Sequence, residues 1–447
     1  MRRVLGYLSR NQEGDRLEKR ALWGMIIIGV VALALRVVYV FISQEYTDLG
    51  ADEMQRAAIS LARDGYIGGV FKGSPGKSAH VAPLYAAFLG GIYKIFGWNT
   101  VTGRLVQDLC ACAVSSIGIC LFPLIAKRMK LPMEIGWVAA IFLALQPLNL
   151  WNETSGSWEQ PYSMLMLLVV ALAFCRLQDE EWSQWRTILL TGLLLGAAAL
   201  LSPSLLPAVA LLFASEWIFK SHHRKRIVTA GLTMMAMVMI IITPWVIRNY
   251  YALGGFIPVR SNFGLELAIG NNPQATGKTF ITYADDPNSP AYNMHPNSSN
   301  KERARMAEIG ELAYMREKQH MAVQWMKEHP GKALELTLAR FRFFWFPPED
   351  EWPRSSNLRL YKSLFFSLIG LWMFGELTVL ILSRHPRAWL LACFVIGPSL
   401  IYMVTHADPR YRYPVFGLSA LLACHFCFRA YGLIRGLSGS KAIPESV

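Results

Sequence analysis

Long apolar runs recur along this sequence and constrain its fold more than any other feature. Stretches of about 17 to 25 residues with few charges alternate with short charged connections, and a helix of that length crosses the hydrocarbon core of a bilayer. Of the 447 residues, 53% are hydrophobic and 17% are charged, whereas soluble domains carry about 25% charged residues. The sequence therefore predicts an all-α polytopic membrane protein and argues against a soluble enzyme or a disordered chain.

We expect about ten transmembrane helices. The first follows a basic N-terminal segment, and it is too long for a signal peptide and lacks a small-residue cleavage site. The ten expected spans are residues 21–42, 104–126, 133–151, 161–178, 187–201, 203–219, 227–247, 360–382, 387–404 and 412–434.

The basic residues set the expected orientation. The chain has 44 Lys and Arg against 31 Asp and Glu, a formal net charge of +13. If the apolar stretch 83–97 lies along the membrane surface, the loop from Lys127 to Lys130 and the loop with Arg384 and Arg387 face the cytoplasm together with the N-terminus, as the positive-inside rule requires. The basic excess is then topological, and no nucleic-acid partner is expected. We expect an integral protein of a bacterial inner membrane whose site faces the periplasm or exterior.

The expected organisation has three parts. Residues 1–247 form an N-terminal membrane module with a catalytic outer loop at 43–103, residues 248–359 form an extracytoplasmic segment, and residues 360–447 form the C-terminal membrane helices. The extracytoplasmic segment should be mixed, with turn-rich sequence around 285–296 followed by an amphipathic helix at about 301–329. All seven cysteines fall inside apolar runs, so no disulfide is expected.

The first outer loop contains a candidate acid or base. Asp52 immediately precedes apolar residues at helical spacing, which predicts a short amphipathic surface helix that ends at Gly65. Asp52 either caps this helix or accepts a proton from an acceptor hydroxyl or amine at the membrane surface. In the second outer loop Glu159 is the other candidate acid, and its alternative role is a solvated acid at a helix start before Pro161.

Cationic residues at the outer face are candidates for phosphate binding. Arg248 leaves the seventh span, and Arg410 and Arg412 lie in the last outer link. Arginines on this side run against the positive-inside bias, and a guanidinium fork suits a phosphate; lipid-headgroup anchoring is the alternative. Lys77 and His80 in the first outer loop either hold a phosphate or are ordinary solvated residues.

No cofactor is expected from the sequence. It contains no G-x-G-x-x-G, so no nucleotide-binding fold is indicated. It also contains no D-x-D triplet, so a divalent metal is possible but unsupported.

These pieces occur in an order that resembles one known superfamily. The pieces are Asp52-Glu53 at the start of a surface helix, Pro83-Leu84-Tyr85, Glu159-Gln160-Pro161-Tyr162, Pro244 to Tyr250, and Arg410-Tyr411-Arg412-Tyr413-Pro414. Together they resemble the GT-C superfamily of integral-membrane glycosyltransferases, in particular the branch of protein O-mannosyltransferases and aminoarabinose transferases. The likeness extends over most of the chain.

The resemblance implies an inverting transfer of one sugar from a polyprenyl-phosphate donor, embedded among membrane lipids, to an unidentified extracytoplasmic acceptor. Asp52 matches the acid proposed as base in this superfamily, and Glu159 matches its second acidic position. The implied donor-phosphate ligands are Arg248, Arg410, Arg412, Lys77 and His80, and the implied substrate-binding residues are Glu53, Tyr85 and Tyr411. The branch often has two adjacent prolines before the tyrosine, where this chain has Val81-Ala82-Pro83, and its basic residue is displaced to Lys77 or replaced by His80.

Two other functions fit a chain of this class. A flippase or transporter for lipid-linked glycans would place ionisable residues deep within spans or show two related halves. A glycan ligase or polymerase would use a diphosphate carrier instead of a monophosphate.

Overall fold

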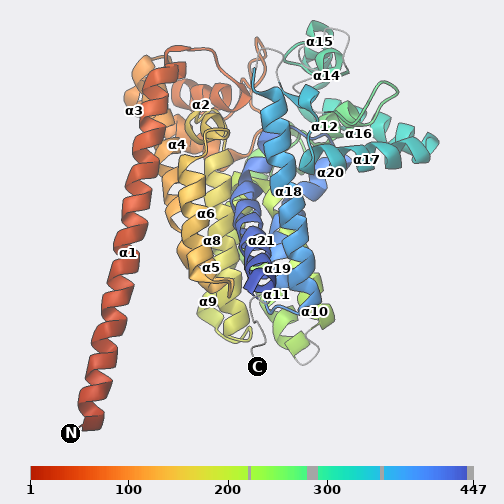
Figure 1. Cartoon of the computed structure of the whole chain (residues 1–447). Coiled ribbons are helices and arrows are strands. Elements are labelled where there is room, and N and C mark those ends of the chain that lie inside the picture. The colour runs from red at the N-terminus through yellow and green to blue at the C-terminus, as the bar shows by residue number, and fades with distance from the viewer. Residues whose placement is uncertain (1, 220–222, 279–289, 353–356, 440–447) are drawn as a thin grey trace.

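The protein is a bundle of long helices capped at one end by shorter ones. The computed structural model describes residues 2–219, 223–278, 290–352 and 357–439, and within these it describes side chains except those of 2–18, 290–291 and 433–439. No strand occurs in these residues, so the all-α prediction is confirmed for them. The bundle helices, shown in Figure 1, are α1 (Arg2–Ser43), α4 (Val101–Cys120), α5 (Phe122–Arg128), α6 (Met133–Leu145), α8 (Gln160–Asp179), α9 (Trp185–Leu201), α10 (Leu206–Phe219), α11 (Arg224–Leu253), α18 (Arg359–Leu382), α19 (Ala388–Ile396), α20 (Leu400–Val404) and α21 (Tyr413–Gly439).

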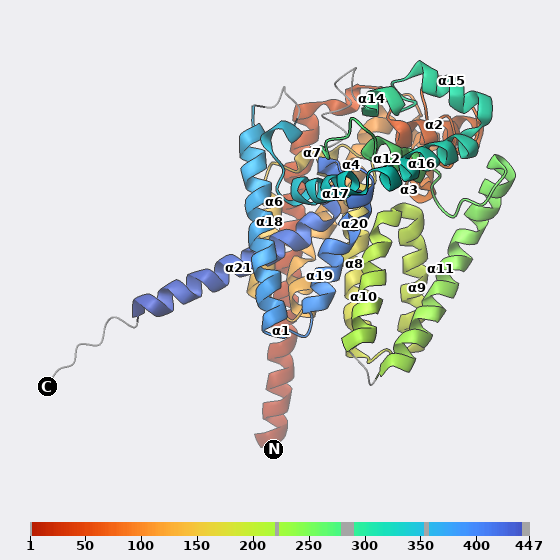
Figure 2. The same cartoon turned by 90° about the vertical axis from the view of Figure 1, so that its right-hand side faces the viewer.

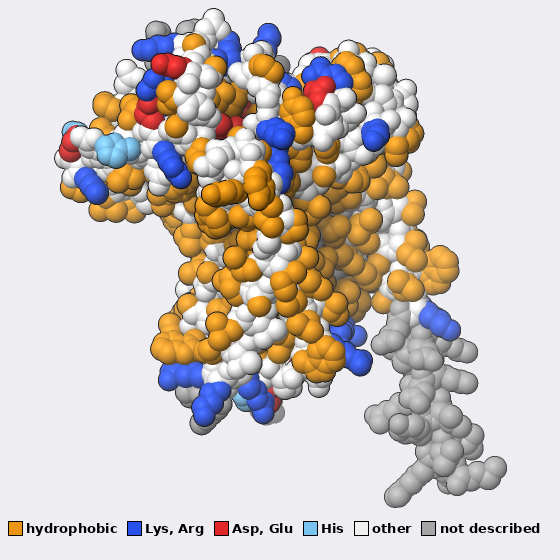
Figure 3. Space-filling model, turned by 180° about the vertical axis from the view of Figure 1, so that it is seen from behind, with side chains coloured by type: hydrophobic (Ala, Val, Ile, Leu, Met, Phe, Trp, Pro, Cys, Tyr) orange, Lys and Arg blue, Asp and Glu red, His pale blue; other side chains and the backbone are white. Residues whose placement is uncertain are grey.

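Shorter helices gather at the end of the bundle opposite to the start of α1, as Figure 2 shows. We call this the capped end. Its helices are α2 (Glu53–Asp64), α3 (Pro83–Phe96), α7 (Leu150–Thr154), α12 (Phe263–Gly270), α14 (Pro290–Met294), α15 (Asn300–Ile309), α16 (Glu311–Glu328) and α17 (Pro330–Trp345). Figure 3 shows a broad apolar band between the capped end and an opposite end that carries Lys and Arg. The stretch 83–97, expected at the membrane surface, is α3, which packs against α2.

The apolar helices make this an integral membrane protein. Six expected spans are helices of at least 18 residues that are long and apolar enough to cross a bilayer. The other four correspond to shorter apolar helices, Met133–Leu145, Trp185–Leu201, Pro203–Phe219 and Ala388–Val404. A 13-residue helix is only about 20 Å long against a core of about 30 Å. The count of ten spans is therefore not confirmed.

Several expected helix boundaries differ from the observed ones. The span expected at 133–151 ends at Leu145, because Pro147 disfavours helix at the residue before it. The amphipathic helix expected at 301–329 is two helices separated by Gly310, whose φ of +84° suits glycine. The described parts of the segment 248–359 are helices and loops, and residues 279–289, part of its turn-rich stretch, lie outside the described residues.

A buried ion pair joins the first span to α7, the short helix before α8. Arg36 Nη2 lies 2.5 Å from Glu153 Oε2, and both side chains are almost fully buried. Arg36 also donates to the carbonyls of Ala32 and Leu143, at 2.9 and 3.0 Å. An arginine within a span is costly unless its donors are satisfied. These bonds therefore fix the position of α7 against α1.

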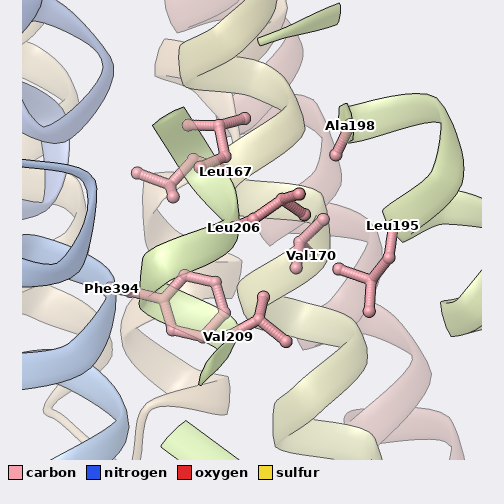
Figure 4. A pocket seen from close by; sticks show the side chains of 8 residues that line it. Leu167, Val170, Leu195, Ala198, Leu206, Val209 and Phe394 are labelled. Carbon is pink, nitrogen blue, oxygen red and sulfur yellow. The ribbon is translucent and has the colours of Figure 1, made fainter. Parts of the chain in front are cut away.

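Within the apolar band, one small cavity lies among α8, α9, α10 and α19. Figure 4 shows its lining, which includes Leu167, Leu195, Leu206 and Phe394 and contains apolar side chains alone. It offers no polar group, so this cavity is not a candidate for chemistry.

Substituting Glu153 tests the buried ion pair. We expect Glu153→Gln to lower the unfolding free energy by roughly 3 kcal/mol, because removing one partner leaves the other charge buried. The control is Glu180→Gln, which breaks the more exposed pair with Arg176 at 2.7 Å and should cost less than about 1 kcal/mol. Thermal unfolding in detergent measures both, and equal shifts would show that the buried pair has no special weight.

Candidate active site

Asp52 lies at the start of α2 with its carboxylate exposed. Its backbone N–H donates to Oε1 of Gln55 at 3.0 Å, and Gln55 in turn donates to Gln107 at 3.3 Å and Ser157 at 3.4 Å. The capping position expected for Asp52 is therefore confirmed. Its side chain has a further contact, because the indole N–H of Trp158 donates to Asp52 Oδ2 at 3.1 Å.

Arg410 lies over the face of the same indole ring. Its guanidinium carbon is 4.2 Å from the centroid of the Trp158 ring, a cation–π distance. Asp408 orients Arg410. Its carboxylate accepts the Arg410 backbone N–H at 2.9 Å and lies 3.7 Å from Nε of the Arg410 side chain. The structure thus brings together an exposed acid from the first outer loop and a cation from the last outer link, with Trp158 between them.

Glu159 and two tyrosines border this arrangement. Glu159 is buried at the start of α8, and its Oε2 has no hydrogen-bond partner among the described residues. It interacts electrostatically with Tyr402, and Tyr402 stacks on Tyr411 with ring centroids 4.3 Å apart. A buried carboxylate oxygen without a hydrogen-bond donor destabilises the folded protein. Glu159 is therefore suited to accept a hydrogen bond from a hydroxyl of a bound molecule.

Glu53 points into a separate buried cluster. His80 Nε2 lies 3.4 Å from Glu53 Oε2, His295 Nε2 lies 3.4 Å from Oε1, and Asn297 donates to Oε1. Burial alone would raise the pKa of Glu53, but His295 and His80 outweigh it and lower that pKa to about 2. Burial is also the main cause of a lowered pKa at His295. The cluster joins α2 to the segment between α14 and α15.

Among the residues that the structure describes, the same three side chains form a group that could hold a metal ion. The possible ligand atoms of Glu53, His80 and His295 lie within 4.8 Å of one another. A metal on His295 Nε2 needs a lone pair there, yet Nδ1 accepts the Asn297 backbone N–H at 3.2 Å. In a neutral ring the proton then lies on Nε2, facing Glu53. This geometry fits a buried hydrogen-bonded cluster better than a metal site.

The other three predicted phosphate ligands outside the Glu53 cluster have different surroundings from Arg410. Arg248 donates to the carbonyls of Ile67 and Ser78 at 2.5 and 2.8 Å, so it holds the first outer loop. Arg412 is buried between the rings of Trp352 and Phe366, at 5.4 and 4.8 Å. Lys77 is exposed on the first outer loop.

Tyr85 supports the site from within the core. It is buried and donates to the carbonyl of Gly156 in the turn that carries Trp158. Its ring packs against Tyr162 at 4.8 Å. Tyr85 therefore positions the turn, and its hydroxyl already has a partner.

Four residues of this region were not predicted from the sequence. They are Trp158, Arg260, Glu266 and His406; Arg260 donates to the His80 carbonyl at 3.0 Å, and His406 pairs with Glu266 at 3.1 Å. The outer-face argument applied to Arg248 applies equally to Arg260 and could have found it. No sequence pattern indicates the other three.

Comparisons with known proteins place the fold. No family model matches the sequence, and no curated protein matches it. Among solved structures, the chain is similar to the archaeal oligosaccharyltransferase AglB from Archaeoglobus fulgidus in complex with an inhibitory peptide and a dolichol-phosphate, with a TM-score of 0.56, 13% identity, and coverage of 96% of this chain and 53% of that one.

Two further structures of the Archaeoglobus fulgidus oligosaccharyltransferase agree. The apo form has a TM-score of 0.56 and 12% identity, covering 96% of this chain and 52% of that one. The form tethered to an acceptor peptide has a TM-score of 0.56 and 14% identity, covering 93% and 50%. At these identities the likeness shows the fold alone, which is the GT-C fold, and this chain spans about half the length of those proteins.

The Glu53 cluster predicts a pH-dependent stability. A carboxylate whose pKa falls from about 4.5 to about 2 on folding stabilises the folded state above pH 4.5, by about 3 kcal/mol, and that contribution is lost as the pH falls toward 2. Glu53→Gln should therefore unfold at a lower temperature than wild type at pH 7, with the difference shrinking by pH 3. Glu308→Gln, on the exposed face of α15, is the control. A difference that stays constant from pH 7 to pH 3 would contradict this assignment.

Proposed function

We propose that this protein is a glycosyltransferase that moves one sugar from a polyprenyl-phosphate donor to an acceptor at the non-cytoplasmic face, by inverting displacement. The observation that carries the proposal is the placement of an exposed carboxylate, Asp52, and a cation, Arg410, around one indole at the capped end of a GT-C membrane bundle. A long prenyl tail partitions into the bilayer, so its phosphate reaches the protein at this level.

In the proposed reaction, the acceptor oxygen or nitrogen attacks the anomeric carbon while Asp52 takes its proton. The bond from the anomeric carbon to the phosphate oxygen breaks, and the phosphate leaves with the electron pair. Arg410 stabilises the charge that develops on that phosphate. Glu159 accepts a hydroxyl of the sugar or acceptor through its unpartnered oxygen, and Tyr411 lines the same side.

The contacts assign different weights to the candidate phosphate ligands. Arg410 is the one placed beside the acid, and exposed Lys77 is open to a second phosphate oxygen. Arg248, bonded to two loop carbonyls, supports the loop that carries Lys77 and His80. We propose that His80 and Glu53 do not contact the substrate and instead fix the position of α2. We propose that Arg412 holds the link between α20 and α21 in place through its contacts with Trp352 and Phe366.

The proposed orientation follows the positive-inside rule, which places the end with Lys127 and Lys130 in the cytoplasm and the capped end in the periplasm of a bacterial inner membrane. The proposed branch, that of O-mannosyltransferases and aminoarabinose transferases, rests on the motif order. An oligosaccharide donor on a diphosphate carrier is the second candidate, because the similar solved structures are oligosaccharyltransferases.

Mass spectrometry of envelope lipids, glycans and glycoproteins tests the proposed activity. Cells without the gene should lack one hexose, pentose or amino-sugar on a single class of molecule. Asp52→Asn should reproduce this loss, because a general base contributes about 10²- to 10⁴-fold in rate. Asp64→Asn, at the exposed end of the same helix, should restore the sugar. An Asp52→Asn strain with the full wild-type sugar pattern would refute the assignment of the base.

The arginines should separate in a donor assay with purified protein. Arg410→Gln should raise the KM for a polyprenyl-monophosphate sugar at least about tenfold, since a charge-assisted phosphate contact contributes roughly 1.5–3 kcal/mol. Arg248→Gln should mainly lower the thermal stability, because it releases two loop carbonyls. Faster turnover of a diphosphate-linked glycan than of the monophosphate sugar would favour the second candidate.

A further inference from the structure

We propose that Trp158 is a positioning residue that keeps the Asp52 carboxylate and the Arg410 guanidinium apart. The effect on donor binding rests on the proposed function, whereas the separation of the two charges rests only on the contacts of Trp158. An anion and a cation that face one site attract each other, and a direct ion pair between them would occupy both the base and the phosphate ligand. Something must hold them close without letting them meet.

The indole ring matches both charges at once. Its N–H edge is positive and donates to Asp52 Oδ2 at 3.1 Å, while its π face is negative and carries the Arg410 guanidinium at 4.2 Å. Arg410 also interacts electrostatically with Asp52. Its ion-pair partner among the described residues is Asp408, at 3.7 Å. Phenylalanine has the face without the donor, and leucine has neither.

The turn that carries Trp158 is held rigidly. Gly156 has a φ of +27°, and a Cβ there would lie 2.7 Å from Cγ of Gln107 and 2.9 Å from its carbonyl oxygen. Tyr85 donates to the Gly156 carbonyl, and Gln55 donates to Ser157. The indole therefore cannot retreat easily when the two charges pull toward each other.

The chain contains a matched control. Trp245 also carries an arginine on its face, with Arg248 at 4.5 Å, and its indole N–H also donates, to the carbonyl of Val259 at 2.7 Å. The acceptor there is a neutral backbone carbonyl, so removal of Trp245 releases no carboxylate from the indole. Trp245→Leu therefore reports the cost of losing a half-buried tryptophan, the same burial class as Trp158.

The first experiment is a double-mutant cycle on thermal stability, which does not depend on activity. Asp52→Asn and Arg410→Gln are combined in the wild-type, Trp158→Leu and Trp245→Leu backgrounds. In the Trp158→Leu background we expect the two changes to become non-additive by a few degrees in Tm beyond wild type, because a direct ion pair has formed. The Trp245→Leu background should show the wild-type coupling. If Trp158→Leu does not fold, Trp158→Phe, which loses the donor and keeps the face, should show a smaller change of the same sign.

The second experiment measures the affinity of the purified full-length protein for polyprenyl phosphate. Trp158→Leu should weaken binding about tenfold, because Asp52 captures Arg410, and Trp158→Leu/Asp52→Asn should recover most of that loss. A tryptophan that only fills space predicts no recovery, as expected for Trp245→Leu/Asp52→Asn. Unchanged coupling in the first experiment, or no recovery in the second, overturns the inference. New coupling in a protein whose wild type does not bind polyprenyl phosphate would instead leave Trp158 as a separator and refute the proposed donor.

Discussion

The ion pair between Arg36 and Glu153 is the interaction on which the capped end depends. It is buried between the first span and α7, and the chain runs from α7 directly into the turn that carries Trp158 and Glu159. Ser115 in α4 adds a bond to the Glu153 carbonyl at 3.0 Å. Inside an apolar bundle no solvent can replace a lost partner of a charged pair. The ion pair therefore fixes α7 against α1, and with it the turn that carries Trp158 and Glu159.

Sequence patterning indicated a candidate site because membrane proteins sort polar residues by depth. Apolar length identified six spans that are long enough to cross, and the Asp before a helical apolar pattern placed Asp52 at the start of α2. The same reasoning could not fix the four shorter apolar helices as spans, since composition does not say where a helix ends within the band. It also missed the break at Gly310, because a glycine inside an amphipathic pattern is compatible with either one helix or two.

Contacts between distant parts of the chain were beyond the sequence. Trp158 is 106 residues from Asp52, and Asn297 is 244 residues from Glu53, so no local pattern relates them. The charge bias similarly assigned Arg248, Arg410 and Arg412 to one side of the membrane. It could not show that Arg248 turns toward two loop carbonyls and Arg412 toward two aromatic rings while Arg410 alone meets Trp158. The side of the membrane on which a residue lies follows from the composition of the loops, whereas the direction in which its side chain points depends on packing.

Two tryptophan–arginine pairs lie at the capped end, Trp245 with Arg248 and Trp158 with Arg410. The same kind of contact has a different role in each. At Trp245 the indole N–H bonds a backbone carbonyl and the arginine bonds two more, so nearly every polar group is satisfied internally and the pair fastens a loop. At Trp158 the indole N–H donates to an exposed carboxylate, and the guanidinium has Asp408 at 3.7 Å and a side-chain hydrogen bond with Tyr411. The Trp158 pair therefore connects two charged side chains, Asp52 and Arg410, whereas the Trp245 pair fastens a loop through neutral carbonyls. The contrast between the two pairs is therefore a physical reason to place the chemistry at Trp158.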